Sequence, residues 1–222
     1  MSTFRNKRPV ISIDGTAGSG KGTLAKKLSK SISFDHLDTG LLYRYLAHLK
    51  LQKKLESFET QDLLKLSINI STIKRLNLRT ELIGKESSII SGLKSVRSFL
   101  LIFQRSFADN PPSGEGSVID GRDIGSVVVP NAEVKFFIDA NLKLRAKRRL
   151  EEIKNLKNKT AASFKTILSQ MRDRDNRDRK RSESPLIISK GSILIDTSQL
   201  TPDQVLKTAL VHVKKILDNK TN

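Results

Sequence analysis

The stretch from Val10 to Thr23, VISIDGTAGSGKGT, constrains the fold more than any other part of the chain. Its first five residues form a short β-branched run closed by glycine, which predicts a buried parallel strand. A helix is predicted from Lys21, because small and leucine side chains then recur at helical spacing. Between them, Gly15 is followed after four residues by Gly20-Lys21. Such a loop can curl its backbone N–H groups around phosphate oxygens, and its lysine can reach a terminal phosphate.

The residue after the lysine narrows the class of phosphate loop. The common pattern places Ser or Thr there to ligate Mg²⁺, but this chain has Gly22, with Thr23 one position later. Glycine followed by threonine is the form seen in nucleoside monophosphate kinases, where most of the Mg²⁺ ligands are phosphate oxygens and water. The loop therefore predicts small-molecule phosphoryl transfer. The residues expected to hold the ATP phosphates are Gly15, Thr16, Ala17, Gly18, Ser19, Gly20, Lys21, Gly22 and Thr23.

Strand patterns and helical patterns alternate along most of the chain. The further apolar strands are HLDTG from His36, SVIDG from Ser117, VKFFIDA from Val134 and SILID from Ser192. This alternation predicts an α/β fold in which helices cover both faces of a parallel sheet. Residues 53–95 differ, because they are polar, rich in serine and made of short alternating pieces. We expect them to form a small inserted subdomain.

The composition limits what else the chain can be. Its 222 residues fit one domain with a smaller insert. It holds no cysteine, which excludes disulfides and thiolate metal sites, and no run approaches the roughly 20 apolar residues of a membrane span. We therefore expect a cytoplasmic protein that binds no membrane. The formal net charge of +18 predicts that polyanions or phosphorylated small molecules are attracted to it.

The run RDRDNRDRKR, from Arg172 to Arg181, holds five arginines, one lysine and three aspartates. Alternating signs suit a solvated helix whose charges pair along its faces, and the run could also be a nucleic-acid-binding tail or part of a site. Arg174, Asp178 and Arg181 lie at i, i+4 and i+7, so on a helix they share one face.

Five segments together resemble bacterial cytidylate kinases: the phosphate loop, LDTGLLYR from Leu37, VIDGRDIGSVVVP from Val118, FFIDA from Phe136 and RDNRDRKRSESPL from Arg174. The resemblance runs from about Val10 to the last helix, and DGRDIG is its most specific piece. It implies an adenylate-kinase-like P-loop NTPase core, a small insert that binds the nucleoside monophosphate, and a helical lid. It also implies transfer of the γ-phosphate of ATP to CMP or dCMP. The implied parts of this single domain are the core at 9–52, 96–145 and 182–222, the insert at about 53–95 and the lid at about 146–181.

The resemblance also assigns roles to single residues. The implied catalytic residues are Lys21, Arg122 and Arg181. The implied CMP-binding residues are Thr39, Arg44, Ser88, Arg97, Arg122, Asp123, Arg174, Asp178 and Arg181. Arg44 and Arg122 would hold the acceptor phosphate, and Asp178 would bind the sugar and orient Arg174. Ser88, Arg97 and Asp123 would read the cytosine, because a carboxylate can accept from its 4-amino group and an arginine can donate to N3 and O2.

Parts of this assignment stay open. Where the family carries an Ile-Arg-Thr segment before the cytosine-reading serine, this chain has LIGKESSIIS, so we expect an acceptor-phosphate arginine to be missing. Ser87 or Ser91 could serve in place of Ser88. Three further side chains of the charged run, Arg172, Asp175 and Arg179, are expected to be solvated.

Mg²⁺ is the expected cofactor, with ATP as the phosphoryl donor. Asp120 ends a strand beside the phosphate loop and could hold the metal through water, or it could only cap the following turn. Asp14 and Asp139 have similar settings and weaker claims. The three histidines lack any partner spacing, so metal binding or acid–base catalysis is not expected of them.

Two other functions fit part of the pattern. A basic P-loop protein that binds nucleic acid and uses ATP as a switch would explain the net charge, but the chain lacks aromatic stacking platforms and has separate acceptor-site residues. A kinase for UMP, AMP or another small acceptor would share the phosphate loop. We expect ATP and CMP or dCMP as substrates, no specific nucleic-acid partner, and a monomer.

Overall fold

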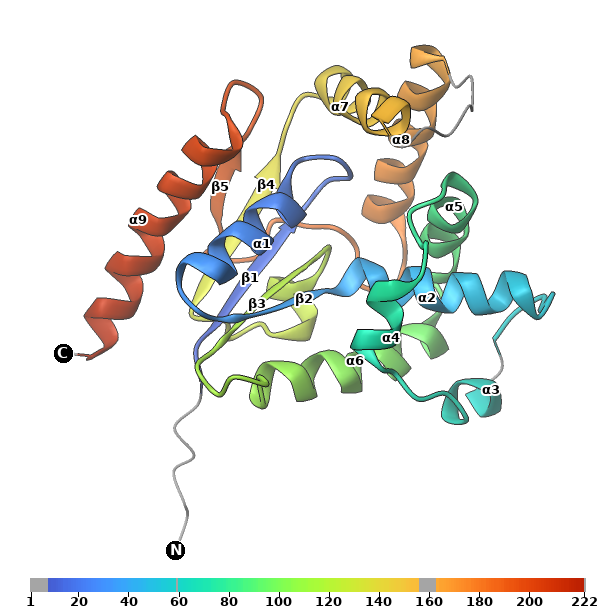
Figure 1. Ribbon diagram of the computed structural model, residues 1–222, viewed down its shortest axis with the longest axis horizontal. Coiled ribbons are helices and arrows are strands. Elements are labelled where there is room, and N and C mark those ends of the chain that lie inside the picture. The colour runs from blue at the N-terminus through green and yellow to red at the C-terminus, as the bar shows by residue number, and fades with distance from the viewer. Residues whose placement is uncertain (1–7, 59, 156–162, 222) are drawn as a thin grey trace, which may run out of the picture.

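The computed structural model describes residues 8–58, 60–155 and 163–221, and in these residues helices flank a five-stranded sheet (Figure 1). The strands are β1 (Val10–Gly15), β2 (Asp35–Asp38), β3 (Ser117–Gly121), β4 (Val134–Asp139) and β5 (Ile193–Asp196). Their order is β2-β3-β1-β4-β5, and every pairing is parallel. The predicted α/β fold with a parallel sheet is confirmed.

The connections between these strands are mainly helical. The helices are α1 (Lys21–Ser31), α2 (Thr39–Gln52), α3 (Thr60–Leu64), α4 (Ile70–Arg75), α5 (Glu81–Ile90), α6 (Lys94–Asp109), α7 (Leu142–Asn155), α8 (Phe164–Lys180) and α9 (Pro202–Thr221), with a short π-helix η1 (Ile124–Val128) after β3. None of the helices in the described ranges is long and apolar enough to cross a membrane.

The burial of each strand follows its place in the sheet. All six residues of β1 and all five of β3 are buried, which suits the continuous apolar runs of central parallel strands. The edge strand β5 is more exposed, and its Leu194 leaves 58% of its surface open. The two strands that lead into the phosphate loop and into DGRDIG are therefore the most firmly held.

Helices cover the two faces of the sheet with separate apolar layers. On one face, α1 and α9 pack over β1 and β4 through side chains such as Leu24, Leu28 and Ala209. On the other face, α2, α6 and η1 share a layer with the segment predicted to be an insert. That segment is helical, as α3, α4 and α5, rather than a set of alternating pieces, and α5 packs along α2. The division into core, insert and lid stays a prediction.

A third, small apolar cluster holds α7 and α8 to the outside of the phosphate loop. Ala146 of α7, Ile167 and Met171 of α8, and Ala17 of the loop belong to it. In Figure 1 these helices stand above the carboxyl ends of the strands, across from α2 and α5. The charged run from Arg172 is therefore helical, as one of its predicted forms required, and it faces the edge of the sheet where the phosphate loop lies.

Candidate active site

The phosphate loop joins β1 to α1 and has the geometry that its glycines predict. A Cβ atom at Gly15 would overlap the backbone carbonyl of Ile138 on β4, so only glycine fits there. Gly20, with φ of 91°, is the N-cap residue of α1 and adopts a left-handed conformation that suits glycine. Lys21 begins α1, so its ammonium and the N-terminal helix dipole serve the same loop.

A cleft of about 1210 Å³ opens beside this loop. Its walls come from the loop, α2, α5, α6, the turn after β3, and the inner faces of α7 and α8. Every residue that the resemblance assigned to CMP lines it: Thr39, Arg44, Ser88, Arg97, Arg122, Asp123, Arg174, Asp178 and Arg181. Lys21 and Asp120 line it too. Of the loop residues, Gly15, Thr16 and Ser19 are buried and do not face the cleft.

Arginines crowd the part of the cleft next to the loop. Arg122 donates from Nε to Asp178 at 2.8 Å. The Nε atom of Arg174 and the Nη2 atom of Arg181 are buried and have no hydrogen-bond partner among the described residues. Burial, and then Arg122, lowers the pKa of Arg174 to about 10, and burial and Arg122 also lower the pKa of Lys21 to about 7. Cationic donors without enough anionic partners are what a phosphate-binding site requires.

Two more arginines line the cleft: Arg44 belongs to α2, and Arg79 belongs to the insert. Arg44 of α2 donates to the backbone oxygen of Leu78 at 2.9 Å, and burial followed by the charge of Arg79 lowers its pKa to about 10. Arg79 itself lines the cleft, 3.1 Å from Asp38. The expectation that the insert lacks such an arginine was therefore wrong. The signal was present, because Leu78-Arg79-Thr80 stands nine residues before Ser88.

Two of the residues assigned to the base, Arg97 and Asp123, contact each other in the wall of the cleft. Arg97 of α6 forms a buried ion pair with Asp123 and donates to the backbone oxygen of Ser91 at 3.0 Å. The ring of Tyr43 lies under the Arg97 guanidinium, 5.7 Å away. The second oxygen of Asp123 is 3.8 Å from Arg181. The two side chains assigned to the cytosine are thus held together in advance, with the lid arginine beside them.

Three serines of the insert were possible readers of the base, and their hydrogen bonds differ. The hydroxyl groups of Ser87 and Ser91 donate to backbone oxygens within their own segment, at 2.9 and 3.0 Å. The Ser88 hydroxyl accepts from Arg177 of α8 at 3.2 Å. Its own proton is therefore available to a ligand, which favours Ser88. Thr39 has a different bond, because its hydroxyl donates to the backbone oxygen of Asp120 at 2.7 Å.

Asp120 is the strand-end aspartate that best fits a role with Mg²⁺. Its Oδ1 atom is buried without a hydrogen-bond partner in the described part of the chain, and His36 Nε2 lies 3.5 Å from it. Its other oxygen would be 3.2 Å from a Cβ atom placed on Gly22, so the carboxylate adjoins the loop. The described residues contain no group of three metal-ligating side chains. This suits a Mg²⁺ held mainly by phosphate oxygens and water.

The two other aspartates considered for the metal have structural partners. Asp139 accepts from the hydroxyl of Thr16 at 2.6 Å and lies 3.9 Å from Arg179. Asp14 accepts from the backbone N–H groups of Ile124 and Gly125. Neither carboxylate lines the cleft, so their weaker claims to the metal are not supported.

The outer face of the charged run is only partly solvated. Arg172 and Arg179 are exposed, as expected. Asp175 is buried, which contradicts the expectation: it is 2.7 Å from Nη1 of Arg145 and accepts from the backbone N–H of Ala17 at 3.4 Å. Arg145 in turn donates to the Ala17 oxygen at 3.0 Å. The helical period placed Asp175 off the acceptor face correctly, but the phosphate loop covers that side of the helix.

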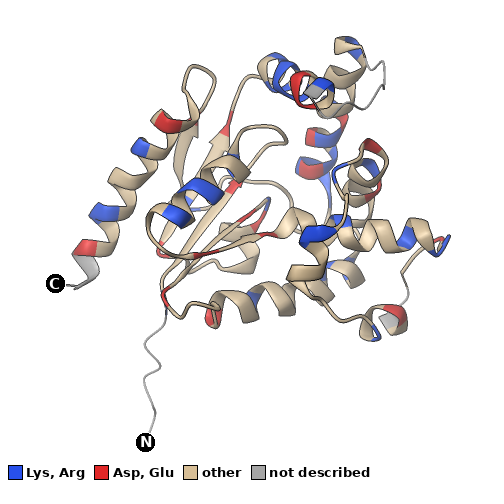
Figure 2. Ribbon diagram, in the orientation of Figure 1, with Lys and Arg blue, Asp and Glu red and all other residues tan. Residues whose placement is uncertain are grey.

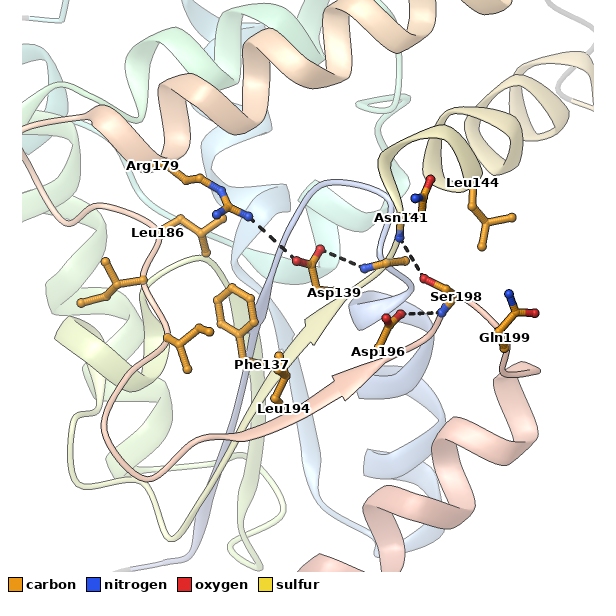
Figure 3. A pocket seen from close by; sticks show the side chains of 13 residues that line it. Phe137, Asp139, Asn141, Leu144, Arg179, Leu186, Leu194, Asp196, Ser198 and Gln199 are labelled. Atoms are coloured by element: carbon orange, nitrogen blue, oxygen red, sulfur yellow. Dashed lines mark hydrogen bonds and ion pairs between the residues drawn. The ribbon is translucent and has the colours of Figure 1, made fainter.

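A second pocket, of about 980 Å³, lies on the other side of α8 and is shown in Figure 3. Arg179 reaches from α8 toward Asp139 on β4, while Asp196 and Ser198 lie at the end of β5. None of its lining residues belongs to the phosphate loop or to the predicted acceptor set. Positive charge is not confined to either pocket, since Figure 2 shows Lys and Arg on α1 and α9 as well as on α7 and α8. The cleft that holds the loop is therefore the candidate active site.

Comparisons with known proteins agree with this geometry. Among solved structures, a gluconokinase from Sinorhizobium meliloti 1021 matches with a TM-score of 0.51 and 11% identity over 98% of both chains. A shikimate kinase from Bacteroides thetaiotaomicron matches with a TM-score of 0.50 and 10% identity, covering 95% of this chain and 98% of that one. At such low identity these likenesses show the fold alone.

Sequence relatives are much more similar. The cytidylate kinase of Bartonella bacilliformis is 43% identical over 212 residues, which cover 94% of this chain and 95% of that protein. The cytidylate kinase of Paramagnetospirillum magneticum is 39% identical over 203 residues, covering 90% and 95%. A family model described as cytidylate kinase matches residues 11–215. The chain, with its phosphate loop and its arginine-lined cleft, belongs to the cytidylate kinase family.

Proposed function

We propose that this chain transfers the γ-phosphate of ATP to CMP or dCMP, giving ADP and CDP or dCDP. The observation that carries the proposal is the buried pair of Arg97 and Asp123, which faces the same cleft as the phosphate loop. A donor site for a triphosphate and a polar site suited to a base thus share one cavity. Family membership and the charge of the cleft support the same reaction.

The donor half of the cleft would hold ATP by its phosphates. The backbone N–H groups of the loop and the N-terminus of α1 face anionic oxygens, and Lys21 can reach the β- and γ-phosphates. The positive charge of Arg122 helps to lower the pKa of Lys21. Bound phosphate would reduce the repulsion between these two side chains. The lysine would therefore charge fully when the donor binds.

The transfer needs charge neutralisation more than proton transfer. The acceptor oxygen already belongs to a phosphate anion, so no general base is required. Arg122 and Arg181 would stabilise the charge that spreads over the transferring group, with Arg174 beside them. In the structure Asp178 accepts a hydrogen bond from Arg122 at 2.8 Å. Burial raises the pKa of Asp178, but the charges of Arg122 and Arg174 outweigh burial and lower the pKa below its ordinary value. An ionised Asp178 would keep both guanidinium groups extended toward the cleft.

Mg²⁺ would be held by the ATP phosphates and, through water, by Asp120. When bound, it would supply further neutralisation of the phosphate charge. The protein's own contribution at this point is the buried oxygen of Asp120, which lacks a hydrogen-bond partner among the described residues.

Cytosine would be selected over uracil by the direction of one hydrogen bond. The Asp123 carboxylate can accept from the 4-amino group of cytosine, whereas uracil presents a carbonyl oxygen there. Arg97 can donate to N3 and O2 while keeping its bond to Ser91. Ser88 would add a donor from the insert, and its contact with Arg177 would couple base binding to the position of α8.

We assign the core to residues 9–52, 96–145 and 182–222, the insert to about 53–95 and the lid to about 146–181. The partners in this proposal are small molecules, and the enzyme acts as a cytoplasmic monomer. The separate apolar clusters under the lid and under the core support a lid that moves on its own.

The deciding experiment is an ADP-release assay with Mg-ATP and a panel of CMP, dCMP, UMP, AMP and no acceptor. We expect turnover with CMP and dCMP, and clearly poorer turnover with UMP and AMP. Preference for UMP or AMP would keep the kinase and reject the cytosine assignment. Tight, strongly salt-dependent DNA binding without acceptor-dependent ADP release would favour the nucleic-acid alternative.

A further inference from the structure

Asp14 is a buried carboxylate that the proposed reaction does not use. It is the residue before Gly15, at the end of β1, and only 3% of its surface is exposed. Its two oxygens accept from two neighbouring backbone N–H groups, Ile124 at 2.8 Å and Gly125 at 2.7 Å. These belong to η1, which directly follows Arg122 and Asp123. The last part of the donor strand therefore holds the turn that carries the base-reading residue.

The start of a helix leaves backbone N–H groups without intrahelical partners, and the side chain of the N-cap residue is their usual acceptor. Asp123 occupies the N-cap position of η1, and aspartate is among the preferred residues there. Yet Asp123 makes no capping bond. Its carboxylate points away, to Arg97 and toward Arg181. Asp14, more than a hundred residues earlier in the chain, caps η1 in its place.

The turn has little room to relieve the loss of this cap by moving. A Cβ atom at Gly125 would be 2.8 Å from the Ser189 hydroxyl and 2.9 Å from the Ser12 hydroxyl. At the preceding strand end, a Cβ atom at Gly121 would be 2.7 Å from the Thr39 hydroxyl. Without Asp14, the two N–H groups of η1 would remain in place and buried, which is costly. The carboxylate in the normal capping position, Asp123, could satisfy them only by leaving Arg97.

We propose that Asp14 is a positioning residue for base specificity: by capping η1 from β1, it leaves Asp123 free to read the acceptor base. This rests on the proposed cytidylate kinase function and deepens it. Asp14 touches neither substrate, and it acts through the orientation of Asp123. Because Asp14 precedes the phosphate loop directly, the same two hydrogen bonds also fix the base-reading turn relative to the donor site.

The test is the ratio of kcat/KM for CMP to kcat/KM for UMP in Asp14→Asn. The asparagine keeps the size of the side chain, but its single carbonyl oxygen can accept from only one of the two N–H groups, and its NH₂ group opposes the other. We expect the CMP-to-UMP ratio to fall by about tenfold or more, the worth of one polar base contact. The KM for ATP should change by no more than about twofold, because the two hydrogen bonds that change are those that hold η1 and not those of the phosphate loop.

A double-mutant cycle with Asp123→Asn separates positioning from a general loss of structure. If Asp14 acts through Asp123, then Asp14→Asn lowers the ratio in the wild-type background and leaves it unchanged in the Asp123→Asn background. The matched control is Glu133→Ala, which removes the side-chain acceptor from the backbone N–H of Val10 (2.7 Å) at the other end of β1. This variant should lose stability while keeping the wild-type ratio.

The outcomes are distinct. Wild-type protein that does not phosphorylate CMP overturns the proposed function, and the inference with it. Wild-type protein that prefers CMP, together with a folded Asp14→Asn variant that keeps the same preference, overturns the inference alone. An equal fall of the ratio in both backgrounds also overturns it, because Asp123 would not be the route. Should Asp14→Asn fail to fold, Asp14→Ser is measured in the same cycle with the same expectations.

Discussion

The two halves of the cleft are built in different ways. The proposed donor half is one continuous stretch, Gly15–Thr23, and it would bind ATP through backbone N–H groups, a helix N-terminus and one lysine. The acceptor half is assembled from side chains on α2, α5, α6, the turn after β3, and α8. Most of these side chains contact one another, as Arg97 does with Asp123 and Arg122 with Asp178.

Because of this difference, we expect the donor half to determine the rate of phosphoryl transfer and the acceptor half to determine which acceptor is used. A backbone cradle recognises phosphate whatever the acceptor is, so changes in the donor half should affect all acceptors alike. A set of paired side chains recognises shape and hydrogen-bond direction, so changes there should affect acceptors unequally. Removing one member of a buried pair also leaves its partner without a counter-charge, which makes the acceptor half sensitive to single substitutions.

The largest effect is expected in the donor half, from Lys21→Ala. The loss of its charge next to the transferring group should lower kcat/KM by about 10³-fold or more. Steady-state kinetics should show nearly the same loss with CMP, dCMP and UMP. The exposed Lys207→Ala on α9, outside the cleft, is the control and should behave like the wild type. A loss confined to CMP would break the comparison, because it would give the loop a part in base selection.

The next effect is in the lid, from Arg181→Ala. The Nη2 atom of its guanidinium is buried and has no hydrogen-bond partner among the described residues, so it can contact charge that develops in the transition state. We expect kcat to fall by about 10²–10³-fold with little change in the melting temperature. Arg179→Ala, two residues earlier and largely exposed, is the control. Small and equal effects from both variants would mean that this end of α8 is only a charged surface.

The donor half could be predicted from the sequence because its evidence is local. Gly15, Gly20 and Lys21 follow a strand pattern and precede a helix pattern, and the backbone geometry follows from the glycines. The parallel sheet could be predicted for the same reason, since its strands are short apolar runs separated by helices. That the acceptor residues lie in one cleft could be predicted only from the family resemblance. Their spacing in the sequence does not indicate that α2, α6 and α8 come together.

What the sequence did not reveal depends on contacts between distant segments. Asp175 was expected to be solvated because a charged helix face normally is, but the phosphate loop packs against it through Ala17. Arg79 was overlooked because the register of the insert could not be read from its Ser-rich composition. The cap that Asp14 provides joins residues 110 positions apart. In each case a long-range contact overrides a local pattern.

A smaller effect, but the sharpest for the comparison, is expected from Asp123→Asn. The amide can donate toward the carbonyl of uracil, so CMP turnover should fall while UMP turnover falls less or rises. The specificity change should be on the order of 1–3 kcal/mol. Ser88→Ala should act in the same direction and more weakly. Competition assays with both acceptors measure this directly, and an equal fall for CMP and UMP would show that Asp123 only supports the phosphate site.

The smallest effect is a proton that should accompany ATP but not CMP. Burial, Arg122 and Arg174 lower the pKa of Lys21 to about 7 when no ligand is bound, so at pH 8 most of this lysine is neutral. The negative phosphates of ATP favour the charged form and raise that pKa, so binding should take up close to one proton at pH 8. Burial lowers the pKa values of Arg44 and Arg174 on the acceptor side only to about 10, so these two arginines stay charged at pH 8 and would take up no proton when CMP binds. Calorimetric titrations in two buffers of different ionisation enthalpy give the number of protons for each ligand. Equal uptake with both ligands would mean that the two halves of the cleft share their charge, and the separation between donor and acceptor sites would then be geometric but not electrostatic.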